Sequence, residues 1–317
     1  MKHDEEHPHT QLDTAAELVS LPRLASHVRV LAECPRPAES TRLENCREYV
    51  TVDLQKRGWN VERHPFTVQT VDGTSLSGVN LIAEHADRPL GDGPRLCLGA
   101  HLDSCPETPG ADDNASAVAA LLELARLLPQ AWPETPRLDL ELVAFDLEEH
   151  GMLGGAQHAA VCHASGVDLR GMVSLEMLGY RDPRPQSQDL PKSLVGLYPD
   201  TGDFIAVVGN QNSAELIDAW GAGMQQVECL PVETLAVPDN GNLLQATRLS
   251  DHSPFWDAGY PALMITDTSF LRNPHYHLPS DTLETLDLDF LRDVSQGCLN
   301  AVRQILSNGL SPLSVDD

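Results

Sequence analysis

The residue types that could do chemistry in this chain follow predicted strands or lie in the loops next to them. They are His101, Asp113, Glu148, Glu149, Glu176 and His277. Imidazole nitrogen and carboxylate oxygen together suit zinc, cobalt or manganese. A carboxylate can bridge two such ions, and two dications in a shielded cleft lower the pKa of a bound water toward ~7. These residues therefore predict a metal-dependent hydrolytic site, in which one further carboxylate takes the proton of the attacking water.

An α/β fold is needed to bring these positions together. Apolar periodicity predicts strands at residues 61–68, 79–83, 95–100, 138–145, 171–175, 204–208 and 262–266, and helices at 15–31, 39–57, 115–128, 154–163, 214–224 and 290–306. Strands that alternate with helices predict a doubly wound α/β fold, which binds ligands at the carboxyl ends of its strands. We expect residues 180–201 and 233–249 to be irregular loops that form the specificity pocket.

Composition narrows the classes of partner. The chain has 47 Asp and Glu against 21 Lys and Arg, a formal net charge of −26, which argues against nucleic-acid binding. No apolar run reaches the ~20 residues of a membrane span, and the first residues lack the pattern of a secretory signal. We therefore expect a cytoplasmic chain without membrane contact. The seven cysteines include no CxxC pair and predict reduced thiols.

The chain is expected to form one domain. Residues 1–12 are polar and without periodicity, which predicts a flexible amino-terminal tail. No internal repeat or low-complexity linker divides the remainder, so residues 13–317 are predicted to be a single domain.

Six short segments carry the chemistry-bearing residues. They are HLDS (101–104), PGADDNASA (109–117), AFDLEEHGMLGG (144–155), SLEMLGY (174–180), SDHSPFWDAGYPALM (250–264) and PHYHLPSDT (274–282). In this order they resemble the signature segments of metallopeptidase family twenty-eight, the co-catalytic dizinc aminopeptidase family related to glutamate carboxypeptidases and glutaminyl cyclases. The resemblance implies a zinc peptidase domain, built as a three-layer α/β/α sandwich with a central mixed, mostly parallel sheet. It also implies two Zn²⁺ ions, with Co²⁺ or Mn²⁺ as substitutes.

The resemblance also implies a ligand set by position. His101 and Glu149 would bind one zinc ion, Glu176 and His277 would bind the other, and Asp113 would bridge the two. The position of Glu176 is frequently Asp in the family, so its longer side chain could alter the spacing or preference of the metals.

Further matched positions suggest roles beside the metals. Glu148 matches the general base that deprotonates the metal-bridging water and later protonates the leaving amine. Asp103 matches the carboxylate that orients a ligating imidazole. The resemblance implies a cis peptide bond before Asn114. His275 competes with His277 as the last ligand, and the family's H-x-x-x-D-T ending favours His277.

Four neighbouring residues each allow two interpretations. The Tyr276 phenol either steadies an oxyanion or packs on the cleft wall. Arg272 either holds a substrate carbonyl or carboxylate with its planar fork or pairs with a carboxylate of the chain. Asp251 and His252 either build the cleft floor through hydrogen bonds or contact the substrate.

The resemblance implies a metal-dependent exopeptidase. We expect an aminopeptidase that acts on peptides with a free amino terminus, whose amine lies beside Glu148 and Glu176. Alternatives are a glutaminyl cyclase-like zinc acyltransferase, a carboxypeptidase or amidohydrolase on the same scaffold, and a non-catalytic module. The complete ligand set favours an enzyme, and Tyr276, where cyclases tend to carry Trp, favours a peptidase. The sequence leaves the preferred first residue and the oligomeric state open.

Overall fold

The computed structural model describes residues 18–69 and 73–312, so the tail predicted for residues 1–12 lies outside the described residues. The described strands form one eight-stranded sheet with the order β1-β2-β4-β3-β5-β8-β6-β7. The strands are β1 (Trp59–Gln69), β2 (Ser75–His85), β3 (Arg95–His101), β4 (Asp139–Phe145), β5 (Leu169–Glu176), β6 (Ile205–Asn210), β7 (Val232–Val237) and β8 (Ala262–Thr266).

The centre of the sheet is parallel. Strands β4, β3, β5 and β8 run in one direction, and β6 with β7 form a further parallel pair. Strands β1, β2 and β6 pair antiparallel with their neighbours β2, β4 and β8. The four central strands are almost wholly buried, as strands covered on both faces must be. The predicted mixed, mostly parallel sheet is confirmed.

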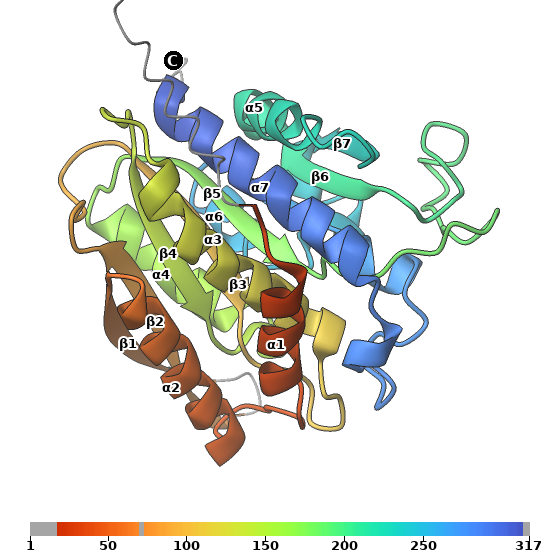
Figure 1. Cartoon of the computed structure of the whole chain (residues 1–317), viewed down its shortest axis with the longest axis horizontal. Helices are drawn as coiled ribbons and strands as arrows, with labels where there is room; N and C mark the ends of the chain where they lie inside the picture. The colour runs from red at the N-terminus through yellow and green to blue at the C-terminus, as the bar shows by residue number, and fades with distance from the viewer. Residues whose placement is uncertain (1–17, 70–72, 313–317) are drawn as a thin grey trace, which may run out of the picture.

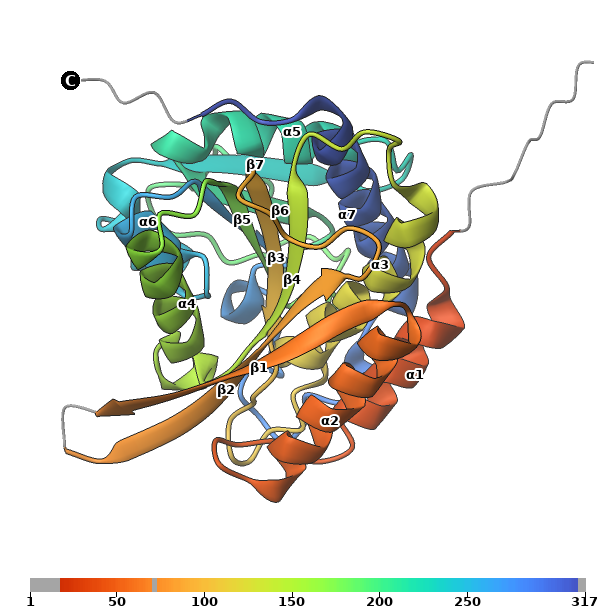
Figure 2. The same cartoon turned by 90° about the vertical axis from the view of Figure 1, so that its left-hand side faces the viewer.

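Helices cover both faces of the sheet. They are α1 (Leu21–Leu31), α2 (Thr41–Lys56), α3 (Ala117–Ala131), α4 (Leu153–Ala164), α5 (Ala214–Met224), α6 (Ser253–Asp257) and α7 (Leu288–Asn308). Figures 1 and 2 show α1, α2, α3, α5 and α7 on one face and α4 with α6 on the other, which confirms the three-layer sandwich. Among the described residues, no helix combines the length and the apolar character that crossing a bilayer requires.

The main differences from the prediction lie between residues 230 and 260. Strand β7 occupies part of the segment that was expected to be irregular, and α6 was not predicted. Strand β7 lies at the edge of the sheet and buries only Val237 fully, so it lacks the apolar signal of an inner strand. Helix α6 has only five residues, too few to show a helical period. Residues 180–201 contain no helix or strand, as expected.

Candidate active site and metal centre

The predicted ligands meet at the carboxyl edge of the parallel strands. His101 is the last residue of β3 and Glu176 the last residue of β5, and these two strands are neighbours. Glu149 lies in a short 3₁₀ turn (Glu148–His150) that follows β4. Asp113 precedes α3, and His277 lies in the loop after β8. Strand order thus brings side chains from distant parts of the sequence to one edge of the sheet.

The donors form two groups of three that share Asp113. His101 Nε2 lies 3.2 Å from Asp113 Oδ1 and 3.6 Å from Glu176 Oε2. His277 Nε2 lies 3.1 Å from Asp113 Oδ2 and 3.1 Å from Glu149 Oε2. Each oxygen of Asp113 therefore faces a different imidazole, which is the arrangement of a bridging carboxylate.

The ligand pairing implied by the resemblance is wrong. His101 is grouped with Glu176 and not with Glu149, while His277 is grouped with Glu149 and not with Glu176. The reason is topological, because β3 and β5 are adjacent and end side by side. Glu149 lies four residues beyond the end of β4, and the turn brings its carboxylate to the side of His277.

The donor set fits divalent cations. His101 Nε2 is buried and makes no hydrogen bond within the described part of the chain, although three carboxylates lie within 3.9 Å of it. Burial disfavours a charge on His277, but hydrogen bonds to Asp113 and Glu149 outweigh burial and raise its pKa to about 10. The carboxylates around the two imidazole nitrogens therefore favour positive charge at both positions. Histidine nitrogens and carboxylate oxygens in this number suit zinc.

Glu148 belongs to neither group of donors. Its Oε2 lies 3.9 Å from His101 Nε2, and its side chain lines the adjoining pocket. Burial raises the pKa of Glu148 well above its ordinary value; the charge of His101 opposes this shift, and the carboxylates of Glu176 and Asp251 add to it. A carboxylate with a raised pKa beside a metal centre is suited to accept a proton.

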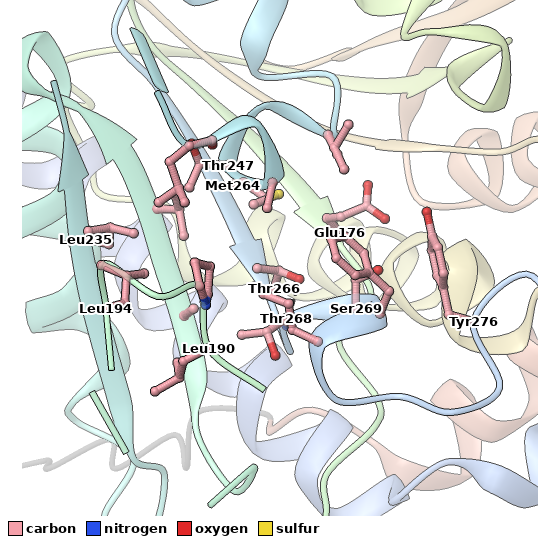
Figure 3. Close-up of a pocket in the computed structure, with 18 of the residues that line it drawn as sticks. Glu176, Leu190, Leu194, Leu235, Thr247, Met264, Thr266, Thr268, Ser269 and Tyr276 are labelled. Carbon is pink, nitrogen blue, oxygen red and sulfur yellow. Dashed lines mark hydrogen bonds between the residues drawn. The ribbon is translucent and has the colours of Figure 1, made fainter. Parts of the chain in front are cut away.

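A pocket of about 270 Å³ opens beside the two groups. Its apolar side chains include Leu190, Leu194 and Leu235, which line one end, while Glu176 and Tyr276 lie at the other (Figure 3). Its acidic residues are Asp113, Glu148, Glu149, Glu176 and Glu233, and no Lys or Arg is among the described residues that line it. The pocket therefore suits a molecule with an apolar side chain at one end. The group attached to that side chain should be neutral or positively charged, because it would lie beside carboxylates.

Residues 80–302 match the sequence model of peptidase family M28. The chain belongs to peptidase family M28. It is 35% identical over 302 residues to the uncharacterised protein YfbL of Escherichia coli K12, a match that covers 89% of each chain. It is also 26% identical over 253 residues to aminopeptidase YwaD of Bacillus subtilis, covering 76% of this chain and 48% of that protein. This M28 protein is therefore a hydrolase related to metal-dependent aminopeptidases.

Solved structures share the fold of this M28 protein. A zinc aminopeptidase from Bacillus subtilis superposes with a TM-score of 0.72 at 15% identity, covering 95% of this chain and 99% of that chain. A glutaminyl cyclase from Porphyromonas gingivalis superposes with a TM-score of 0.68 at 21% identity, covering 90% and 99%. These likenesses show the fold of the M28 protein, and the fold by itself does not distinguish the two activities.

Asp103 connects the donors of this M28 protein. Its two carboxylate oxygens accept hydrogen bonds from the backbone N–H groups of Glu148 (3.1 Å) and Glu149 (3.2 Å). Its Oδ1 also lies 3.6 Å from Nδ1 of His101. One buried carboxylate thus holds the Glu148–Glu149 turn against the imidazole of β3. Asp103 lies where the resemblance places the ring-orienting carboxylate, and that role stays a prediction.

The loop that carries Asp113 is held on both sides. The Asp113–Asn114 peptide bond is cis, as the resemblance implies. The Asn114 side chain donates to the carbonyl of Leu175 (2.9 Å) and accepts from the N–H of Met177 (2.9 Å). The Asp281 carboxylate accepts from the N–H of Asp113 (3.1 Å). These contacts tie the bridging residue to the end of β5 and to the loop of His277.

Three residues next to the donors were not singled out from the sequence. Ser250 donates to Glu176 Oε2 (2.8 Å), Asp281 supports Asp113, and the Cys105 thiol donates to Glu149 Oε2 (3.1 Å). Ser250 and Asp281 lie inside the SDHS and PSDT segments, so position in a motif was the available signal. Nothing in the sequence marked Cys105, because its contact depends on how the loop after β3 folds.

Tyr276 lies in the pocket, and its ring stacks on His277 with centroids 3.8 Å apart. Figure 3 shows its phenol and the Glu176 carboxylate at the same end of the pocket. His275, the competing histidine, lies 3.0 Å from Ser280 Oγ through its Nδ1 and joins neither group. His277 is therefore the histidine that meets Asp113 and Glu149.

The three residues proposed for substrate contact lie behind the pocket wall and do not line it. Arg272 is buried, donates to Gln188 Oε1 (2.8 Å) and to the carbonyl of Phe204 (2.7 Å), and so braces the long loop. Asp251 and His252 are fully buried, and His252 Nε2 lies 2.9 Å from the carbonyl oxygen of Thr247. For these residues the structure supports the interpretation as parts of the framework.

Proposed function

We propose that this chain is an aminopeptidase that holds two zinc ions and removes apolar residues from the amino terminus of peptides. One observation carries the proposal: two groups of donors share Asp113 at one end of an apolar pocket. His101, Asp113 and Glu176 would hold one ion, and His277, Asp113 and Glu149 would hold the other. Zn²⁺ is favoured by this donor set, and Co²⁺ or Mn²⁺ could replace it.

The chain's own residues supply the proton transfers. When bound, the ions would polarise the scissile carbonyl and lower the pKa of the attacking water. Glu148 accepts the proton of that water and then delivers it to the nitrogen of the leaving amine. Its position fits this task because it lines the pocket and belongs to neither group of donors. Asp103 keeps Glu148 in place by accepting its backbone N–H.

The charges of the pocket favour action at the amino terminus. A free α-ammonium group would lie next to Glu148 and Glu176, whose side chains both line the pocket. A carboxypeptidase needs a cationic side chain for the terminal carboxylate. Among the described pocket residues there is no Lys or Arg, His277 is engaged with Asp113 and Glu149, and Arg272 is engaged behind the wall. We therefore favour the aminopeptidase over a carboxypeptidase.

A second candidate function is a glutaminyl cyclase, favoured by the shared fold with the Porphyromonas enzyme. Two features argue against it. The second group of donors is complete, and Tyr276 stands before His277 where cyclases tend to carry Trp. A cyclase of this type would hold one zinc ion, so the number of ions per chain separates the two functions.

The test compares matched substrates. Leucine, phenylalanine, glutamate and lysine p-nitroanilides report the preferred first residue, and N-acetyl-leucine p-nitroanilide reports the need for a free amine. We expect hydrolysis of the free leucine and phenylalanine compounds, loss of activity after chelation, and recovery on addition of Zn²⁺, Co²⁺ or Mn²⁺. Equal hydrolysis of the acetylated compound, or full activity in a strong chelator, would contradict the proposal. Conversion of Gln-peptides to pyroglutamyl peptides would point to the cyclase.

A further inference from the structure

A second cluster of metal-binding side chains lies inside the protein, between the sheet and α4. Cys97 of β3 and Glu141 of β4 are directly paired in the parallel register, so both side chains face the same side of the sheet. His158 and Cys162 of α4 are four residues apart and share one face of the helix. Two donors from the sheet thus meet two donors from the helix. None of the four residues is more than 5% exposed.

This cluster is separate from the catalytic centre. Cys97 and His101 both lie on β3, four residues apart, which corresponds to ~13 Å along a strand. The surroundings are apolar and aromatic: the rings of Phe145 and Phe255 each lie 6.1 Å from the His158 ring. None of the interactions described for the catalytic centre involves the cluster. Its polar atoms therefore need a reason of their own for being buried.

The donor atoms converge on one nitrogen. His158 Nε2 lies 3.0 Å from Glu141 Oε2 and 3.8 Å from the Sγ of Cys162. The thiol of Cys97 contacts both His158 and Glu141, and the ligand atoms of these three residues lie within 4.8 Å of one another. An imidazole nitrogen offers one N–H or one lone pair, so it cannot satisfy three partners at once.

A tetrahedral cation held by Cys97, Glu141 and His158 would take as its fourth ligand the sulfur of Cys162, which contacts His158 but lies outside the group formed by the other three. With zinc–sulfur and zinc–nitrogen bonds of ~2.3 and ~2.0 Å, neighbouring ligand atoms of a tetrahedral site are ~3.3–3.8 Å apart. The observed separations of 3.0 and 3.8 Å are close to that range. Two sulfurs, one imidazole and one carboxylate suit zinc in preference to harder cations such as magnesium or calcium.

The local charges are consistent with a divalent ion. Arg95 Nη1 donates to the second oxygen of Glu141 (3.0 Å), so Glu141 could use one oxygen for the metal while the other is held by Arg95. Two thiolates, one carboxylate, one dication and the Arg95 guanidinium sum to zero, which is the least costly total for a buried group. A surface pocket of about 260 Å³ includes His158 in its wall, so an ion would reach the cluster from the side of His158.

We propose that Cys97, Glu141, His158 and Cys162 form a structural zinc site, distinct from the catalytic pair of ions. The ion ties α4 to the centre of the sheet. Helix α4 begins three residues after the turn that carries Glu148 and Glu149, so the site also anchors the frame of the catalytic turn. Binding displaces the protons of both thiols, and affinity therefore rises with pH.

The test uses cobalt as a spectroscopic probe, because only a thiolate ligand gives a sulfur-to-cobalt charge-transfer band. The starting protein is Cys105→Ser, which removes the thiol beside the catalytic donors. We expect the chelated and cobalt-loaded protein to show this near-ultraviolet band. Cys162→Ala in the same background should abolish or strongly weaken the band and lower the metal content by one ion per chain. Cys298→Ala, which removes a buried thiol of α7, should leave both unchanged.

The cobalt spectrum and the metal content test the proposed zinc site independently of peptidase activity. Far-ultraviolet circular dichroism and thermal unfolding report whether each variant folds. If Cys162→Ala does not fold, the spectrum of the Cys105→Ser protein decides alone, since with Cys105 replaced Cys97 is the one described cysteine that remains in a group of potential metal ligands. Absence of the band after cobalt loading, or a Cys97–Cys162 disulfide in the purified protein, would overturn the proposal.

Discussion

Replacement of Glu148 by Gln tests the proposed proton acceptor most directly. The amide has the same size, and the backbone N–H of residue 148 stays bonded to Asp103, so position is retained. Glu148 belongs to neither group of donors and lies 3.9 Å from the nearest imidazole nitrogen, so the metal content should not change. Only the capacity to accept a proton is lost. A positioned general base contributes ~10²–10⁴ in rate, which corresponds to ~3–5 kcal/mol in the activation barrier.

The assay is steady-state hydrolysis of leucine p-nitroanilide with zinc content measured on the same samples. We expect kcat to fall by a factor of ~10²–10⁴, with KM changed only slightly and zinc retained. Glu107→Gln is the matched control, because Glu107 is an exposed carboxylate of the loop that follows Asp103 and should keep wild-type kinetics. A kcat within about threefold of wild type would remove Glu148 from its role. Loss of zinc would instead make Glu148 a ligand.

Two further predictions concern stability. Gly223→Ala in α5 should lower the free energy of unfolding by about 1–3 kcal/mol, since a Cβ there would lie 2.3 Å from the backbone Cα of Ala301 in α7. Gly221→Ala in the same helix meets only a methyl group at 3.4 Å and should be neutral or stabilising in urea titrations, and equal losses for both variants would refute the packing argument. Burial lowers the pKa of His252 to about 3, below its value of ~6.5 in the unfolded chain. Unfolding therefore takes up a proton between these pH values, and stability rises with pH across that window. His252→Gln should flatten this rise in urea midpoints measured from pH 4 to 7, and an unchanged slope would show that His252 does not contribute it.

The layers of the fold were predictable because its inner elements have strong periodicity. Strands β3, β4 and β8 and helix α3 are long or apolar enough to be found from local pattern, and their predicted bounds agree with the structure within a few residues. Strand β7 and helix α6 were missed for the opposite reason. An edge strand needs few apolar residues, and a five-residue helix is stabilised by its neighbours more than by its own sequence.

The sequence by itself determined which residues are the candidates for the chemistry, because His101, Asp113, Glu149, Glu176 and His277 stand in ordered motifs next to strand ends. Only the tertiary structure decided how these residues are grouped. The adjacency of β3 and β5 joins His101 to Glu176, and strand order is not written in local periodicity.

The same distinction applies to the second cluster. The spacing of His158 and Cys162 marks one face of a helix, but their meeting with Cys97 and Glu141 depends on the register of two parallel strands and on the packing of α4. Contacts between residues that are remote in sequence depend on the packing of the whole chain, so no local sequence pattern predicts them.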